Sequence, residues 1–463
     1  MALKPAATPA ELRLHRGALI AILATMPLLA ALWGFASQQR GAPTWPADLV
    51  DAAPRGRILS SDGQVLADGP VGARRYPQGT LAGPLVGFTG AVQPDGRYGL
   101  EGFEHTLDAR LQTGEAVVLT IDASLQAAAE SRLAEAATLY QARSATAVVL
   151  EVGTGRVLAA ASWPSYDPNA WRTSDPAAMR NRPLVQQYEP GSVMKPFLVA
   201  GLLESGRLDP RERIEAPMTL RVGWKTFRDV TQHDPVLSVA DVLRYSSNTG
   251  TIALAQRFES PELHAWLAAF GFGQEMGMRS TFASKGSLTD PARWVPQDHA
   301  TIAIGQGVAT TNLQLAAAYA VLAQDGVYVA PRLVEDESVP PSYRVLSPET
   351  ALAVRHMLAY TVEAGSLRQS AVPGVPTAGK TGTADVYDAD LGSYVAGKYA
   401  VSFAGMFPVE RPEVVMVVTV HEPVTLTSST LVAAPLFRAI GAEVVAHWAV
   451  APDAPAWARA AVR

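Results

Sequence analysis

The sequence contains no cysteine, and its eight histidines never fall at metal-ligand spacing. Zinc and iron–sulfur sites depend on such side chains, so we expect neither a metal nor another cofactor. The chain also lacks an excess of basic residues, because its 463 residues carry a net charge of −5. A nucleic-acid partner would require a basic face, so the charge argues against that class of function.

Lysine is scarce as well. Only six of the 38 basic residues are lysines, so the chain uses arginine wherever a fixed positive charge suffices. Lysine differs from arginine because it can lose its proton and because its ammonium is a compact point charge. A lysine retained in this background is a candidate for such a role, although for any one lysine alone an incidental position is the simpler reading.

One N-terminal segment predicts a membrane anchor. Residues 18–37 hold twenty positions without a charge, which is enough for one transmembrane helix. The flanking basic residues favour a cytoplasmic tail at 1–17, with the rest of the chain after the helix outside the cytoplasmic membrane. These residues are Lys4, Arg13 and Arg16 before the helix and Arg40 after it. A cleavable signal peptide ending near Ala36 is the alternative, although the apolar stretch is long for one. A soluble core helix is the weakest reading.

The next hundred residues are rich in loops. With 48% apolar and 17% charged residues, the chain predicts a folded protein of two or more domains. Residues 54–67 predict two short strands around a Ser-Asp-Gly turn, residues 116–122 a strand, and residues 124–140 a helix. Residues 41–142 therefore suit a spacer or docking module, a pedestal, better than an enzyme core.

The pattern changes near Ala145 to that of an α+β domain, for which we predict bounds of 143–450 and a frayed tail at 451–463. Alternating residues predict a strand pair at 145–164, and strands return at 399–409 and 413–423. The expected helices are 193–204, 239–257, 261–269, 311–324 and a last one at 429–448. Strands at both ends with helices between them predict a sheet closed by distant segments.

The first of three motifs is Ser192-Val193-Met194-Lys195. Pro190-Gly191 breaks the chain before it, so Ser192 should open a helix and lie on one face with Lys195. A serine hydroxyl needs a base to become nucleophilic, and a lysine desolvated in a cleft can be neutral enough to act as one. Read alone, the pattern is weak, because a capped, solvated helix start would look the same.

The second motif is Ser246-Ser247-Asn248, after a helical run. Ser246 can relay a proton between Lys195 and the leaving or attacking amine, and the Asn248 amide can hold a peptide carbonyl. Alone, this cluster is more simply a turn at a helix end.

The third motif is Lys380-Thr381-Gly382-Thr383, expected on an edge strand that a peptide substrate would line. Lys380 can supply a cation for a C-terminal carboxylate, and Gly382 can let a substrate backbone approach. The amides of Thr383 and Ser192 can form an oxyanion hole, in which each donor is worth about a hundred- to a thousandfold in rate.

Residues 374–381 also match the nucleotide-binding pattern G-x-x-x-x-G-K-[ST] in full. That loop needs a helix starting at the lysine and backbone amides around phosphate, but Pro376 removes one donor and no helical periodicity follows. We therefore reject the nucleotide reading. In the order S-x-x-K, S-x-N, K-T-G, the three motifs form the signature of β-lactamases and penicillin-binding proteins.

With these motifs in place, the chain resembles the class B penicillin-binding proteins from about Pro54 to Arg438. The supporting phrases include RGRILSSDGQVLA, GLEGFE, LTIDASLQ, PSYDPN, YEPGSVMKP, RYSSNTG, AGKTGTA and SFAGMFP. The resemblance implies an anchored pedestal and a transpeptidase domain with a five-stranded antiparallel sheet flanked by helices. It also implies the reaction: Ser192 attacks the penultimate D-Ala of a peptidoglycan stem pentapeptide, and an amine of a neighbouring stem resolves the acyl-enzyme.

The resemblance further implies that β-lactams trap Ser192, because they imitate the D-Ala-D-Ala end. No segment resembles a glycosyltransferase domain, so that activity would come from a SEDS-type membrane partner among the division proteins. The phrasing favours the division-type branch over the elongation type. A D,D-carboxypeptidase or β-lactamase, or a catalytically silent division scaffold, are the remaining alternatives. Serine at position 247 and the lack of an E-x-x-L-N segment favour transfer over hydrolysis.

Overall fold

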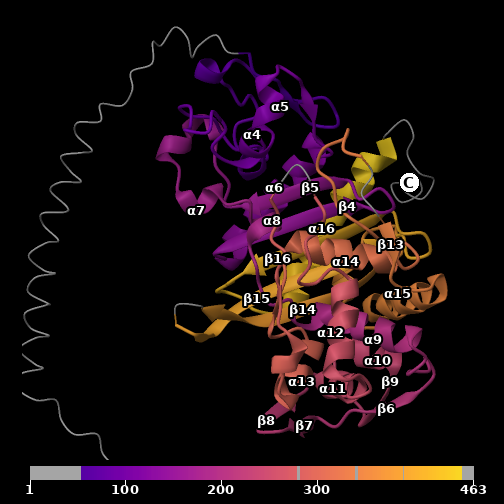
Figure 1. Cartoon of the computed structure of the whole chain (residues 1–463). Coiled ribbons are helices and arrows are strands. Elements are labelled where there is room, and N and C mark those ends of the chain that lie inside the picture. Colours follow the sequence, from indigo (N-terminus) through magenta and orange to yellow (C-terminus); the bar gives the residue numbers. More distant parts are fainter. Residues whose placement is uncertain (1–53, 279–281, 339–341, 366, 389–390, 451–463) are drawn as a thin grey trace, which may run out of the picture. The chain divides into compact units, whose positions relative to one another are not determined.

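The computed structural model describes residues 54–450 apart from 279–281, 339–341, 366 and 389–390 (Figure 1). The predicted anchor at 18–37 and the predicted tail at 451–463 lie outside the described residues.

A five-stranded antiparallel sheet with the order β14-β15-β16-β4-β5 forms the centre of the described fold (Figure 1). Strands β4 (Ser144–Glu151) and β5 (Val157–Trp163) come from one end of the domain. Strands β14 (Ala378–Asp388), β15 (Ser393–Phe407) and β16 (Val414–His421) come from the other end. Strand β16 pairs with β4 along its whole length. The predicted α+β fold, with a sheet closed by distant segments, is confirmed.

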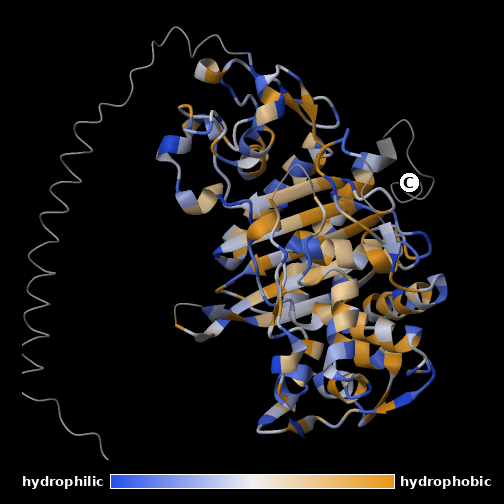
Figure 2. Cartoon of the chain, in the orientation of Figure 1, coloured by the Kyte–Doolittle hydropathy of each residue, from blue (hydrophilic) through white to orange (hydrophobic). Residues whose placement is uncertain are grey.

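Helices cover both faces of this sheet, so its residues are buried on each side. On β16, Met416 and Val418 pack in the cluster of α6 (Ala123–Tyr140) and α16 (Ser429–Val450). The alternate residues Val415 and Val417 join the cluster of α9 (Lys195–Glu204) and α14 (Asn312–Ala323). Figure 2 shows the central strands as predominantly apolar, as a sheet covered on two faces requires.

Helix α16 is the one helix in the described part of the chain that is long and apolar enough to cross a membrane. Its apolar window, Ser429–Trp448, is 56% buried, and Phe437 within it contacts Phe403 of β15. It therefore packs as a core helix of the sheet.

Most predicted elements agree with the structure, but one predicted helix is wrong. Residues 239–257 form two helices, α10 (Val239–Arg244) and α11 (Asn248–Ala255). Ser246 between them has a φ of +55°, a left-handed conformation that ends α10, and the Ser247 hydroxyl caps α11. The strand expected at 116–122 is reduced to β3 (Val117–Val118), and α12 covers Ser260–Ala269.

The remaining elements are mostly short. The other helices are α3 (Gly83–Val86), α4 (Gly102–Thr106), α5 (Asp108–Gln112), α7 (Pro176–Met179), α8 (Arg182–Val185), α13 (Pro296–Ala303) and α15 (Pro348–Glu363). The other strands are β1 (Ile58–Leu59), β2 (Val65–Ala67), β6 (Arg213–Glu215), β7 (Thr219–Val222), β8 (Lys225–Arg228), β9 (Val236–Ser238), β10 (Ser287–Leu288), β11 (Val308–Ala309), β12 (Val327–Val329) and β13 (Ser342–Arg344).

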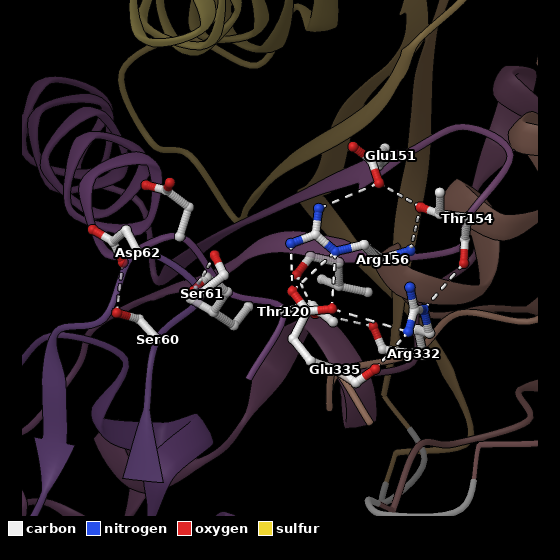
Figure 3. A network of polar contacts seen from close by, with 12 residues as sticks. Ser60, Ser61, Asp62, Thr120, Glu151, Thr154, Arg156, Arg332 and Glu335 are labelled. Atoms are coloured by element: carbon white, nitrogen blue, oxygen red, sulfur yellow. Dashed lines mark hydrogen bonds and ion pairs between the residues drawn. The ribbon is translucent and has the colours of Figure 1, made fainter. Parts of the chain in front are cut away.

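The segment 330–336 joins β3 to the start of β5. Glu335 N donates to Val118 O at 2.9 Å, and Thr120 N donates to Leu333 O at 2.9 Å. The Arg156 guanidinium, at the start of β5, binds both oxygens of the Glu335 carboxylate (Figure 3). These backbone hydrogen bonds and the bidentate Arg156–Glu335 ion pair attach the β1–β3 region to the five-stranded sheet.

A buried ion cluster stabilises the segment between β1 and α5. Glu104 accepts from Arg55 Nε and Arg74 Nε at 2.6 Å each, and Arg55 also lies 2.8 Å from Asp108 Oδ1. The side chains of all four residues are at most 2% exposed. Each charge depends on its partners, because an unpaired ion at this depth has a large desolvation cost.

We predict that Glu104→Gln lowers the free energy of unfolding by about 3–5 kcal/mol. The neutral amide would remove the negative charge that Arg55 and Arg74, both buried, share. Denaturant unfolding of the full chain measures this. The control is Arg57→Met, which removes a pair with Asp68 whose side chains are 60% and 42% exposed, and it should cost less than about 1 kcal/mol. Equal effects of the two substitutions would contradict the prediction.

Candidate active site

Ser192 lies in a tight turn that leads directly into α9. Gly191–Met194 form a 3₁₀ turn, and α9 begins at Lys195, so the predicted helix start is present with a tighter first turn. Gly191 N donates to Gly305 O at 2.8 Å, and the Tyr319 hydroxyl donates to Val193 O at 2.9 Å. The turn is thus held on both sides of Ser192.

The Lys195 side chain is fully buried and points at the second motif. Its Nζ donates to Ser246 O at 2.6 Å and to Asn248 Oδ1 at 2.8 Å, and it lies 3.4 Å from Ser246 Oγ. Burial, together with the nearby charge of Lys380, holds the pKa of Lys195 well below its usual range, and Asp229 opposes this only in part. Within the described residues the Ser192 hydroxyl makes no hydrogen bond, so its contact with Lys195 stays a prediction.

Lys380 contacts the same serine hydroxyl. It lies on β14, which is an edge strand as predicted, and its side chain is buried. Its Nζ donates to Ser246 Oγ at 2.9 Å and to Thr381 O at 3.1 Å. Burial lowers the pKa of Lys380 to about 7. Two amines of lowered basicity therefore share one hydroxyl.

Strand β14 packs closely on the Ser192 turn. A Cβ at Gly191, which has a φ of +62°, would lie 2.6 Å from Thr383 O, and a Cβ at Gly382 would lie 2.4 Å from Pro190 O. Gly382 is therefore required for contact between β14 and the turn, and the closer approach of a substrate that we expected from it stays a prediction. The oxyanion role of the Ser192 and Thr383 amides is likewise a prediction.

The other β14 positions differ in exposure. The Thr381 residue is 8% exposed, whereas Thr383 is exposed and donates to Ser429 Oγ at 2.9 Å. Strand β14 runs through Lys380 without a break, and no helix begins there. That geometry excludes a nucleotide-binding loop at 374–381, as the sequence indicated.

Asp229 is a residue of this site that the sequence did not reveal. Its carboxylate accepts from Ser247 Oγ and Asn248 N at 2.5 Å each, and from Thr249 Oγ1 at 2.9 Å. These hydrogen bonds lower the pKa of Asp229 against the opposing effect of burial. The carboxylate thus holds the start of α11, where Asn248 meets Lys195. A buried helix N-terminus beginning with Ser-Asn-Thr needs an acceptor, but nothing in the sequence says which carboxylate supplies it.

His233 contacts the Asp229 carboxylate. His233 Nε2 lies 2.7 Å from Asp229 Oδ2, and both side chains are at most 1% exposed. Burial lowers the pKa of His233, but the hydrogen bonds with the Asp234 carbonyl and Asp229 outweigh it, so the pKa is raised overall. The Asn248 amide nitrogen donates to Arg228 O at 2.9 Å, and its Oδ1 accepts from Lys195, so both ends of this amide have partners and one N–H is left for a further hydrogen bond.

The comparisons with known proteins agree with this geometry. A family described as penicillin binding protein transpeptidase domain matches residues 145–442. The chain belongs to this family. It is 33% identical to the probable peptidoglycan D,D-transpeptidase PenA of Neisseria gonorrhoeae, over 76% of this chain and 64% of PenA. It is 31% identical to the peptidoglycan D,D-transpeptidase FtsI of Escherichia coli, over 82% of this chain and 68% of FtsI.

A solved structure is similar over most of the chain. Penicillin binding protein 3 of Mycobacterium tuberculosis matches with a TM-score of 0.77 and 31% identity, over 87% of this chain and 98% of that one. Other structures of that protein are complexes with aztreonam and ampicillin. These relatives confirm the predicted resemblance to division-type class B penicillin-binding proteins.

We predict that Asp229→Asn lowers the pKa of His233, because the substitution removes the carboxylate that helps to raise it. NMR titration of the histidine ring in this penicillin-binding protein measures the change. The control is Asp290→Asn, which alters the exposed cap of the 3₁₀ turn Pro291–Arg293 and is not among the groups that shift the pKa of His233. An unchanged His233 pKa in Asp229→Asn would show that the two side chains are not coupled.

Proposed function

We propose that the protein is a serine D,D-transpeptidase that cross-links peptidoglycan stem peptides through an acyl-enzyme on Ser192. The observation that carries this proposal is the contact of the Ser246 hydroxyl with both the Lys195 and the Lys380 amine, where Lys195 directly follows the Ser192 turn. Membership of the family, and the names of the relatives PenA and FtsI, support the same activity.

The first half-reaction forms an ester. Ser192 Oγ attacks the carbonyl carbon of the penultimate D-Ala, and its proton passes to Lys195, whose lowered pKa makes the neutral amine accessible. The tetrahedral oxyanion is stabilised by the amides of Ser192 and Thr383. When the peptide bond breaks, the terminal D-Ala leaves with a proton delivered through Ser246.

The second half-reaction transfers the acyl group. An amine of a neighbouring stem attacks the ester, gives up a proton through the same lysine and serine, and releases Ser192. Lys380 and Thr381 bind the C-terminal carboxylate of the donor, and Asn248 binds a donor carbonyl through its amide. No further co-reactant is required, because the energy of the D-Ala-D-Ala bond is conserved in the ester.

We further propose that the reaction takes place outside the cytoplasmic membrane during septal wall synthesis. Residues 18–37 would anchor the chain, residues 41–142 would form the pedestal, and residues 143–450 would carry the transpeptidase. At the end of the pedestal, α6 packs on the central sheet and would join the two parts. A SEDS-type glycosyltransferase of the division machinery would supply the glycan strands. The names of FtsI and penicillin binding protein 3 support the division role by relationship.

The test of the activity is labelling with a fluorescent penicillin. The wild type should form a long-lived covalent adduct, and Ser192→Ala should form none, because the attacking oxygen is gone. Gel fluorescence measures both. Labelling that survives in Ser192→Ala would remove Ser192 from its role, an unlabelled wild type would indicate a silent scaffold, and rapid turnover of penicillin would indicate a β-lactamase.

The two lysines should respond differently to arginine. Lys195→Arg should slow acylation by at least about a hundredfold, because arginine cannot accept the proton. Lys380→Arg should be milder, since the carboxylate needs only a positive charge. Stopped-flow or gel-based acylation rates distinguish the two, and equal losses would contradict this division of roles.

The pH dependence of acylation tests the role of Lys380 separately from that of Lys195. A carboxylate-bearing β-lactam requires protonated Lys380, whose pKa is lowered to about 7, so the second-order rate constant for acylation should fall as the pH rises through about 7. In Lys380→Arg this fall should disappear, because the guanidinium stays charged. A wild-type profile that keeps rising through pH 8 would contradict the assignment.

A further inference from the structure

A pocket with a volume of about 390 Å³ lies beside the proposed active site. Its walls come from the β7–β8 hairpin, the segment around α13, and β15, and the side chains that matter most are Trp224, Lys225, Arg293, Trp294 and Tyr394. None of these residues has a role in the three motifs.

The pocket is joined to the Ser192 turn through Glu189, three residues before Ser192. Two residues of the pocket wall donate to the same Glu189 oxygen, the Tyr394 hydroxyl at 2.9 Å and Gly307 N at 2.9 Å. The second oxygen, Glu189 Oε2, is buried without a hydrogen-bond partner in the described part of the chain. Glu189 therefore connects the wall of the pocket to the segment that carries Ser192.

The direction of β14 leads from the motifs to this pocket. A donor peptide with its carboxylate at Lys380 and its reacting carbonyl near Thr383 would continue along the strand toward Tyr387. Tyr387 pairs with Tyr394 across the β14–β15 hairpin, and their ring centroids lie 5.4 Å apart. At about 3.4 Å per residue, the stem residues upstream of the two D-alanines reach Tyr394.

The chemistry of the pocket suits an acidic peptide segment. Neither Lys225 nor Arg293 makes an ion pair within the described part of the chain. Lys225 lies 3.5 Å from Thr301 Oγ1 and 5.1 Å from the centroid of the Phe227 ring, and its charge helps to lower the pKa of Glu189 against the larger effect of burial. The single acidic residue among the described lining residues, Asp298, accepts from Val295 N at the start of α13. Two cations without ion-pair partners among the described residues, in a pocket that two tryptophans also line, match free carboxylates on an aliphatic backbone.

Indole rings supply the apolar part. Trp224 is 77% exposed at the tip of the β7–β8 hairpin, so a large aromatic surface faces solvent beside the two cations. The tip is held against α13: with its amide oxygen toward the indole, Gln297 accepts from Trp224 N at 2.9 Å and from Trp224 Nε1 at 3.2 Å. An exposed indole fixed in this way indicates a binding surface.

We propose that this pocket binds the carboxylate-bearing segment of the donor stem peptide, upstream of its two terminal D-alanines, through Lys225, Arg293 and the Trp224 ring. This inference rests on the proposed transpeptidase function. It assigns recognition of the acidic part of the donor to residues outside the catalytic motifs.

The experiment compares two donor thioesters, a stem-peptide analogue whose carboxylates upstream of the terminal D-alanyl group are free and the same analogue with these upstream carboxylates amidated. The C-terminal carboxylate, which Lys380 binds, is free in both. In the wild type the free-carboxylate donor should acylate about tenfold faster, the effect of one charge-assisted contact. In the double variant Lys225→Met, Arg293→Met this ratio should fall to about one. Active sites are counted with fluorescent penicillin, so that a misfolded fraction does not affect the rates.

The matched control is Lys398→Met, a lysine of β15 that pairs with Glu422 outside the pocket, and it should keep the wild-type ratio. A ratio near one in the wild type, or one that persists in the double variant, would overturn the proposal. So would a loss confined to transfer onto the attacking amine, because the pocket would then serve the acceptor strand. If penicillin fails to label the wild type at all, the proposed function itself fails, which is a distinct result.

Discussion

Two lysine amines contact one serine hydroxyl, and both amines are so deeply buried that they lose basicity. Burying an ammonium is costly unless it finds acceptors or releases its proton, and this site uses both solutions. Lys195 has a backbone carbonyl and an amide oxygen as acceptors, while Lys380 has the serine and its own strand. The rest of the site keeps these groups at fixed positions.

Close backbone packing provides that fixation. Gly191, Gly305 and Gly382 each stand where a Cβ would meet the backbone of a neighbouring segment at 2.6 Å or less. The Ser192 turn is thereby pressed between the loop before β11 and strand β14. A methyl group at any of these positions would move the nucleophile away from the amines. In this protein, Gly382 of the third motif thus serves the packing of the chain itself.

The sequence was informative where chemistry is encoded locally. Motif spacing predicted the residues that meet at Ser246, and alternation predicted β4, β5 and β16, because a buried strand shows its period in its own residues. Asp229 was missed because its partners Ser247 and Thr249 lie 18 and 20 residues further along the chain, and no local pattern reports such a contact. His233 was missed with it, because its place in the site depends on Asp229. The break at Ser246 was missed for a related reason. A left-handed serine inside a helical pattern is held by surrounding contacts, not by its own propensity.

The order of the strands in the sheet also has a consequence for how the protein folds. Strands β4 and β5 are made early, but their neighbour β16 follows more than 200 residues after β4 along the chain. During synthesis the edge of β4 that pairs with β16 therefore stays unpaired until β16 has been made. Contacts between residues this distant in sequence make folding slow, and in the meantime the unpaired strand edges can associate with other chains. We expect the newly made chain to depend on protection from aggregation until β14, β15 and β16 have been completed.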